Sequence, residues 1–246
     1  MTAVTHREDI PARLSRIAIR VVICATLAFG TAVACAATAD VARETRWAEQ
    51  IVPQLVVGDA VWLATPRHPR ILALYTEPAK ATREAVIVVH GMGVNPDWNL
   101  IGVLRTALAD RGFATLSVQM PVLAADARSD AYGKLFPDAG ERLRAAVAWL
   151  RARGYARIAI VSHSMGAAMT DAWLARAPLG VDAWVPVGMM EAFAVPPRQP
   201  VLDVVAERDF PKALVVSGTD HYFGDAATRL AEAIAPFIAS ALGGSC

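Results

Sequence analysis

The chain has 246 residues, of which 55% are hydrophobic, and its formal net charge is +1. This composition predicts one globular domain with enough chain to bury a substantial core, and it excludes an intrinsically disordered protein. The near-neutral charge, with no Lys and Arg clusters interleaved with aromatic residues, argues against a nucleic-acid-binding protein.

Residues 1–39 have the pattern of a secretory signal peptide. Four arginines precede an apolar run over residues 21–34, and small residues follow. We expect cleavage before Asp40, with Ala36 as the next choice, so that a periplasmic or secreted domain spans residues 40–246. The apolar run is short for a transmembrane helix, and an uncleaved anchor is the alternative.

The cysteines agree with export but predict no internal disulfide. Cys24 and Cys35 lie in the signal segment, so cleavage leaves Cys246 as the only thiol. This predicts a monomer that can form disulfide-linked dimers in an oxidising compartment. Contact with a membrane is expected only if the N-terminal segment is retained or Cys35 is lipidated.

The domain begins with a pattern typical of a β-hairpin. Apolar runs at residues 56–63 and 71–75 flank a proline-containing turn, which predicts two strands at the edge of a sheet. His68 lies between two prolines in that turn, and we expect it to be exposed to solvent.

Strands and helices then alternate along the chain. A run that is apolar on both faces, residues 85–90, predicts a buried parallel strand. After residues 122–137, which could form a short flap over a site, Asp138 is expected to cap the next helix. The remaining predicted elements are helix 98–112, strand 114–121, helix 138–154, strands 183–190, 201–205 and 213–217, and a final helix kinked at Pro236.

This alternation predicts an α/β fold, with a doubly wound, mostly parallel sheet and helices on both faces. In such sheets ligands bind at the carboxyl ends of the strands. Residues that directly follow predicted strands are therefore the first candidates for a functional site.

Ser164 stands where one predicted strand ends and a helix begins without a linker. A sharp strand-to-helix turn of this kind exposes a nucleophilic hydroxyl, and it requires small residues two positions before and after the nucleophile. These positions hold Ser162 and Gly166. The usual pattern has glycine at both, so Ser162 departs from it.

A serine nucleophile needs a base and an acid that orients the base, and strand-end loops supply both further along the chain. His221 is the preferred base, because it reaches the nucleophile from a separate loop, whereas His90 and His163 are expected to be structural. Asp209 is the preferred acid. The rival acids are Asp203, Glu207 and Asp220.

Backbone N–H groups must also stabilise the oxyanion that develops during attack on an ester. The residue after the nucleophile, Met165, and the loop after strand 85–90, at Met92, occupy the expected places. Gly91 and Gly93 flank Met92 and let this backbone turn toward a substrate.

At these positions the chain resembles the α/β-hydrolase superfamily. The resemblance covers roughly residues 55–242 and rests on the motifs His90-Gly91-Met92-Gly93, Ser162-His163-Ser164-Met165-Gly166, Asp209 and Asp220-His221. The phrases Met120-Pro121-Val122-Leu123 and Asp220-His221-Tyr222-Phe223 look similar to an exported bacterial branch whose substrates are undefined. The family's fold and the triad roles of Ser164, Asp209 and His221 are what this resemblance implies.

The stretch of sequence between Ser164 and Asp209 is too short to contain a large lid domain, so we expect an open site. Gly91, Trp98, Met190 and Tyr222 are predicted to contact the substrate, a small or medium acyl ester. The His and Cys spacing matches neither zinc nor phosphate-loop patterns, and we expect no metal and no cofactor. A catalytically silent binding or scaffold protein of the cell envelope is the alternative.

Overall fold

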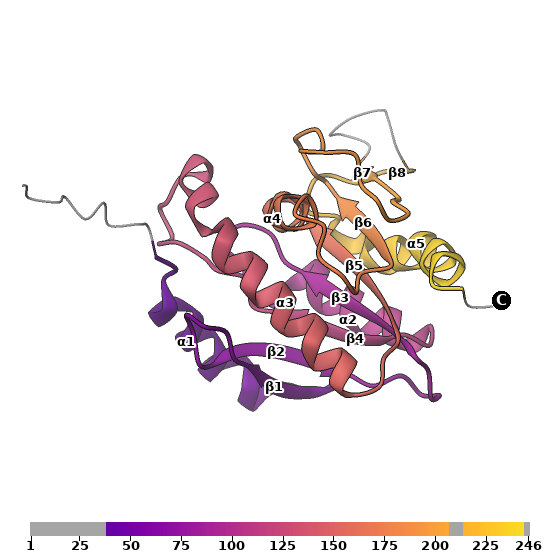
Figure 1. Cartoon of the computed structure of the whole chain (residues 1–246), viewed down its shortest axis with the longest axis horizontal. Coiled ribbons are helices and arrows are strands. Elements are labelled where there is room, and N and C mark those ends of the chain that lie inside the picture. The colour runs from indigo at the N-terminus through magenta and orange to yellow at the C-terminus, as the bar shows by residue number, and fades with distance from the viewer. Residues whose placement is uncertain (1–37, 207–213, 244–246) are drawn as a thin grey trace, which may run out of the picture. The chain divides into compact units, whose positions relative to one another are not determined.

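The computed structural model describes residues 38–206 and 214–243 (Figure 1). The α-helices are α1 (Val41–Ile51), α2 (Asn99–Asp110), α3 (Phe136–Ala152), α4 (Met165–Leu174) and α5 (Ala227–Ala241). The strands are β1 (Asp59–Leu63), β2 (Ile71–Thr76), β3 (Glu84–Val89), β4 (Ala114–Val118), β5 (Arg157–His163), β6 (Ala183–Val187), β7 (Val204–Ala206) and β8 (Leu214–Val216). The short 3-10 helices are η1 (Val52–Gln54), η2 (Ser129–Leu135) and η3 (Gly224–Ala226).

The described strands form one eight-stranded sheet in the order β1-β2-β4-β3-β5-β6-β7-β8. β2 pairs antiparallel with β1 and with β4, and all other neighbours are parallel. The predicted hairpin at the sheet edge and the doubly wound, mostly parallel α/β fold are confirmed. The carboxyl ends of β3 and β5 lie side by side, so the segments that follow them meet at one edge of the sheet.

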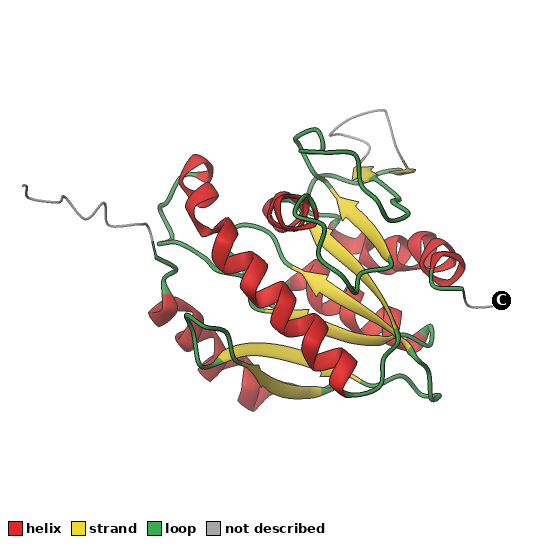
Figure 2. Cartoon of the chain, viewed as in Figure 1, coloured by secondary structure: helices red, strands yellow, loops and turns green. Residues whose placement is uncertain are grey.

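Helices cover both faces of this sheet (Figure 2). α3 and α4 pack on one face, where the core includes Leu143, Leu150 and Trp173. α2 and α5 pack on the other, where Leu104 and Ile234 are fully buried. In the part of the chain that the structure describes, no helix is both long and apolar enough to cross a membrane.

The start of α3 corrects two expectations. The helix begins at Phe136, directly after η2, so Asp138 lies inside its first turn and is not the N-cap. The Asp138 carboxylate instead pairs with the buried guanidinium of Arg142 and, at 3.1 Å, with Nε2 of His68. His68 is therefore only partly exposed, contrary to the expectation of a solvent-exposed side chain. A buried guanidinium requires an anionic partner, and this requirement outweighs capping.

Candidate active site

Ser164 lies at the turn between β5 and α4, and its backbone has a conformation that residues other than glycine rarely adopt. Its φ is 53° and its ψ is −124°. Strain of this kind persists only where the surroundings enforce it, and it clusters at functional sites. Here the Ser164 N–H donates to the carbonyl of Val187 at the end of β6, 2.8 Å away. The predicted strand-turn-helix arrangement is present.

The small residues two positions before and after Ser164 are explained by different contacts. A Cβ on Gly166 would overlap the carbonyl oxygen of His90, so helix α4 can approach the end of β3 only with glycine there. Ser162, where the usual pattern has glycine, is fully buried. Its Oγ accepts a hydrogen bond from Nε1 of Trp184 on the neighbouring strand, at 2.8 Å.

The structure brings His221 to Ser164. The Nε2 atom of His221 lies 2.8 Å from the Ser164 Oγ, within hydrogen-bond distance for proton transfer. His163 helps to hold His221 in place. Its Nε2 donates to the backbone carbonyl of His221 at 2.8 Å, and the centroids of the two rings are 5.1 Å apart. The serine, its neighbouring histidine and the base thus form one contiguous group.

His90 is buried beneath the loop that carries Met92. Its Nε2 accepts the N–H of Met120 at 2.8 Å, so the hydrogen of the neutral ring is on Nδ1, which donates to the Gly91 carbonyl at 2.8 Å. Burial lowers the pKa of His90 to about 4, which keeps this ring neutral. Gln119 donates a second hydrogen bond to Nε2 at 3.1 Å.

This contact orients the peptide between Gly91 and Met92. In a trans peptide the C=O and N–H point in opposite directions, so fixing the Gly91 oxygen toward His90 turns the Met92 N–H away from it. Met165 is the first residue of α4, and its N–H has no acceptor within the helix. One predicted oxyanion donor thus lies in the turn after β3 and the other at the start of α4.

Asp209, the predicted acid, lies outside the described residues. Of its rivals, Glu207 also lies outside them, and Asp220 accepts the backbone N–H of Tyr222 at 3.0 Å. Asp203 precedes β7, where partial burial raises the pKa of its carboxyl. The residue that orients His221 is therefore still a prediction.

A cavity of about 380 Å³ opens beside Met165, one residue after Ser164. Its walls come from the segment that was predicted to form a flap, from α4 and from the loop after β6. The lining residues are Ser129, Asp130, Gly133, Phe136, Met165, Ala168, Asp171, Ala172, Met189, Glu191, Ala192 and Ala194. This size is typical of a small-molecule pocket.

Only some of the residues predicted to contact the substrate lie close to Ser164 and the cavity beside Met165. Trp98 and Tyr222 pack edge to face, with ring centroids 6.1 Å apart, and Tyr222 and Met92 are exposed. Gly91 lies against the elbow, since a Cβ there would stand 3.3 Å from the Ser164 Cβ. Met190 is exposed and does not line the cavity beside Met165, whereas its neighbour Met189 does.

Among the described residues, no group of three or more His, Cys, Asp or Glu side chains is arranged to hold a metal ion.

In sequence, residues 20–139 match a family described as "Protein of unknown function (DUF3530)". No curated protein is significantly similar to the chain. Solved structures are similar in fold. An α/β serine hydrolase homologue from Coxiella burnetii is 17% identical, with a TM-score of 0.59, over 74% of this chain and 98% of that one.

Two further structures extend this similarity. A serine hydrolase without a lid from Xanthomonas campestris is 18% identical, with a TM-score of 0.58, over 78% of this chain and 98% of its own. A dienelactone hydrolase from Anabaena variabilis is 19% identical, with a TM-score of 0.61, over 74% and 97% of the two chains. These likenesses establish the α/β-hydrolase fold without a large lid.

Proposed function

We propose that this chain is an exported serine hydrolase that cleaves small or medium carboxylic esters through an acyl-enzyme on Ser164. The observation that carries the proposal is the 2.8 Å contact between the Ser164 Oγ and Nε2 of His221, made from a strained strand-to-helix turn. A serine placed only for packing needs neither the strained backbone nor an imidazole within hydrogen-bond distance.

In the proposed reaction, the Ser164 Oγ attacks the ester carbonyl carbon while His221 Nε2 takes the hydroxyl proton. The N–H groups of Met92 and Met165 bind the resulting oxyanion. The tetrahedral intermediate then expels the alcohol, which receives the proton from His221. Water adds to the acyl-enzyme with His221 again as base, releasing the carboxylic acid and restoring Ser164. Asp209 is assigned to orient His221 during both steps.

The cavity beside Met165 is the proposed acyl-binding pocket. Met165, Met189 and Phe136 give it apolar surface, and its volume of about 380 Å³ suits a short acyl or aromatic acyl group better than a long chain. Met189 lines the proposed pocket, whereas Met190, the predicted substrate contact, lies outside it. The fold without a large lid agrees with a site that is open to soluble esters.

The test is a series of p-nitrophenyl esters of graded acyl length, together with a fluorophosphonate probe. We expect hydrolysis of the short esters and stoichiometric labelling, and a loss of at least about 1000-fold in kcat/KM for Ser164→Ala and for His221→Ala. Ser240→Ala, a change at an exposed serine on α5, is the matched control and should be unchanged. Absence of both turnover and labelling in folded protein contradicts the proposal.

A catalytically silent scaffold is the second candidate, since the fold alone does not establish activity. It predicts a folded protein whose Ser164 does not react with the probe. Replacing Asp209 by Asn separates an active triad from a silent one, because only an active enzyme loses kcat while its stability is retained.

Export is a separate part of the proposal. Helix α1 begins at Val41 and is capped by Asp40, whose Oδ1 accepts the Arg43 N–H, so cleavage before Asp40 leaves every described helix and strand in place. Intact-mass analysis of periplasmic protein tests this. A mass that includes residues 1–39, or a diacylglycerol on Cys35, identifies a membrane-tethered enzyme instead.

A further inference from the structure

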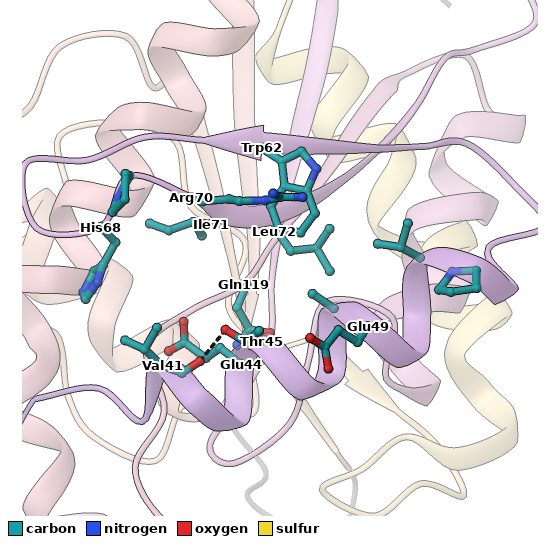
Figure 3. A pocket seen from close by; sticks show the side chains of 14 residues that line it. Val41, Glu44, Thr45, Glu49, Trp62, His68, Arg70, Ile71, Leu72 and Gln119 are labelled. Atoms are coloured by element: carbon teal, nitrogen blue, oxygen red, sulfur yellow. Dashed lines mark hydrogen bonds between the residues drawn. The ribbon is translucent and has the colours of Figure 1, made fainter.

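A second, larger cavity lies between helix α1 and the hairpin β1–β2 (Figure 3). Its volume of about 610 Å³ is within the usual range of ligand pockets, and none of the candidate catalytic residues line it. The lining residues are Val41, Glu44, Thr45, Ala48, Glu49, Val52, Pro53, Trp62, His68, Pro69, Arg70, Ile71, Leu72 and Gln119.

Aliphatic side chains form a continuous part of the wall of this cavity. α1 contacts the sheet through the small side chain of Ala48, which packs near Leu72, and the aliphatic groups of Val41, Val52 and Ile71 line the space that remains. The mouth carries a different chemistry, because the Arg70 guanidinium lies 3.9 Å from the ring centroid of Trp62. A bound molecule would therefore bury an apolar body between the helix and the hairpin.

Hydrogen-bond acceptors lie at the inner end. Gln119 is only 1% exposed, and its Oε1 accepts no hydrogen bond from the described residues, while its Nε2 donates to the Met120 carbonyl at 2.7 Å. Glu44 is also buried, and its carboxylate accepts from the Val122 N–H and from Arg142. A carboxylate has about four acceptor sites, so Glu44 retains capacity as well.

The charges at this end favour a donor and disfavour an anion. Two carboxylates, Glu44 and Asp138, face one guanidinium, that of Arg142. The Nε2 of His68 donates to the Asp138 carboxylate, 3.1 Å away. A buried acceptor without a donor is unfavourable, and a ligand hydroxyl would remove that cost.

We propose that this cavity binds an uncharged, elongated apolar molecule that carries one hydroxyl group, which donates its hydrogen to the acceptors at Gln119 and Glu44. The molecule's apolar body lies between α1 and the hairpin, and its far end lies near Trp62 and Arg70. This site is independent of the reaction proposed for Ser164.

The test uses the full mature chain and N-phenyl-1-naphthylamine, an uncharged apolar fluorophore with one N–H donor. We expect its fluorescence to rise on binding and 1-decanol to displace it. Decyl methyl ether, which has no donor, should compete about tenfold more weakly, the value of one hydrogen bond, and decanoate more weakly still. Equal competition by the alcohol and the ether overturns the assignment of the acceptors.

Two matched variants locate the binding. Val41→Trp, at an exposed lining position, and Ala48→Trp should each weaken probe binding about tenfold or more, whereas Ala168→Trp, in the cavity beside Met165, should leave it unchanged. Weakening by Ala168→Trp alone places the probe in the active-site cavity and overturns the proposal. So does a dimer in sedimentation that Val41→Trp dissociates, because the cavity would then be a surface for self-association.

Discussion

The hydroxyl of Ser162 and the indole of Trp184 form a buried hydrogen bond of 2.8 Å between the neighbouring strands β5 and β6. Both side chains are fully buried, and Ser162 stands two residues before the candidate nucleophile. A glycine at this position would leave the indole N–H without this acceptor. The departure from the usual glycine therefore stabilises the strand pair that presents Ser164.

The first prediction concerns this pair. Ser162→Gly should lower the free energy of unfolding by about 1–3 kcal/mol, because it leaves the buried N–H of Trp184 unpaired. Reactivity of Ser164 with a fluorophosphonate should persist, since glycine satisfies the close approach of the elbow. Urea denaturation followed by far-UV circular dichroism measures the change.

Trp184→Phe supplies the control. In the double variant with Ser162→Gly, the total loss of stability should be smaller than the sum of the two single losses, because either substitution alone already removes the hydrogen bond. Additive losses would show that the hydrogen bond contributes no stability.

The second prediction concerns His163 as a positioning residue. His163→Phe keeps an aromatic ring against His221 and Phe223 but removes the Nε2 donor to the His221 carbonyl. We expect kcat for the best ester to fall roughly tenfold with KM nearly unchanged, because the base is less well held. His163→Gln, which retains a donor, should recover part of kcat. A purely structural role would instead lower the stability of both variants and leave kcat of the folded fraction unchanged.

Much of the fold could be predicted from the sequence, because apolar runs and glycines report local requirements. β3 is apolar on both faces and therefore had to be buried, and Gly166 was required by the close approach of α4 to β3. The elbow, the hairpin and the order of the elements all follow from patterns within a few residues of each other.

The main feature that sequence patterns missed joins distant segments of the chain. Arg142 is completely buried because Glu44, from a helix 98 residues earlier, and Asp138 both pair with it. No local sequence pattern predicts that an arginine is buried. Met189, which lines the cavity beside Met165, was not among the predicted substrate contacts, because hydropathy does not encode the direction of a loop side chain.

The third prediction concerns the close approach at Gly166. Gly166→Ala should lower stability by about 3 kcal/mol or more, because its Cβ would meet backbone atoms of His90, which cannot move aside as a flexible side chain could. Gly133→Ala is the matched control, since a Cβ there meets nothing within 4 Å. It should change stability by no more than about 0.5 kcal/mol. Equal effects of the two substitutions in thermal or urea unfolding would contradict the elbow geometry.

The last prediction is a dependence of stability on pH that arises at His90. Burial lowers the pKa of His90 to about 4, against an unfolded value of 6.5. The hydrogen bond to the Gly91 carbonyl opposes this shift, and Arg142 and His163 add to it more weakly. Between about pH 6.5 and pH 4, His90 binds a proton in the unfolded chain but not in the folded chain. The contribution of His90 to the free energy of unfolding is therefore complete above about pH 6.5 and is lost progressively down to about pH 4. The loss attributable to this ring is about 3 kcal/mol.

His90→Gln removes this titration while its side-chain oxygen can still accept the Met120 N–H. The variant should therefore be less sensitive than the native protein to pH between 6.5 and 4, although it lacks the Nδ1 donor to Gly91 and is less stable at neutral pH. Urea unfolding at half-unit pH steps for both proteins gives the comparison, and the titrations of other groups cancel in the difference. Parallel curves over this range would mean that His90 is protonated in the folded protein, and that the Gly91–Met92 peptide is held by something other than a neutral imidazole.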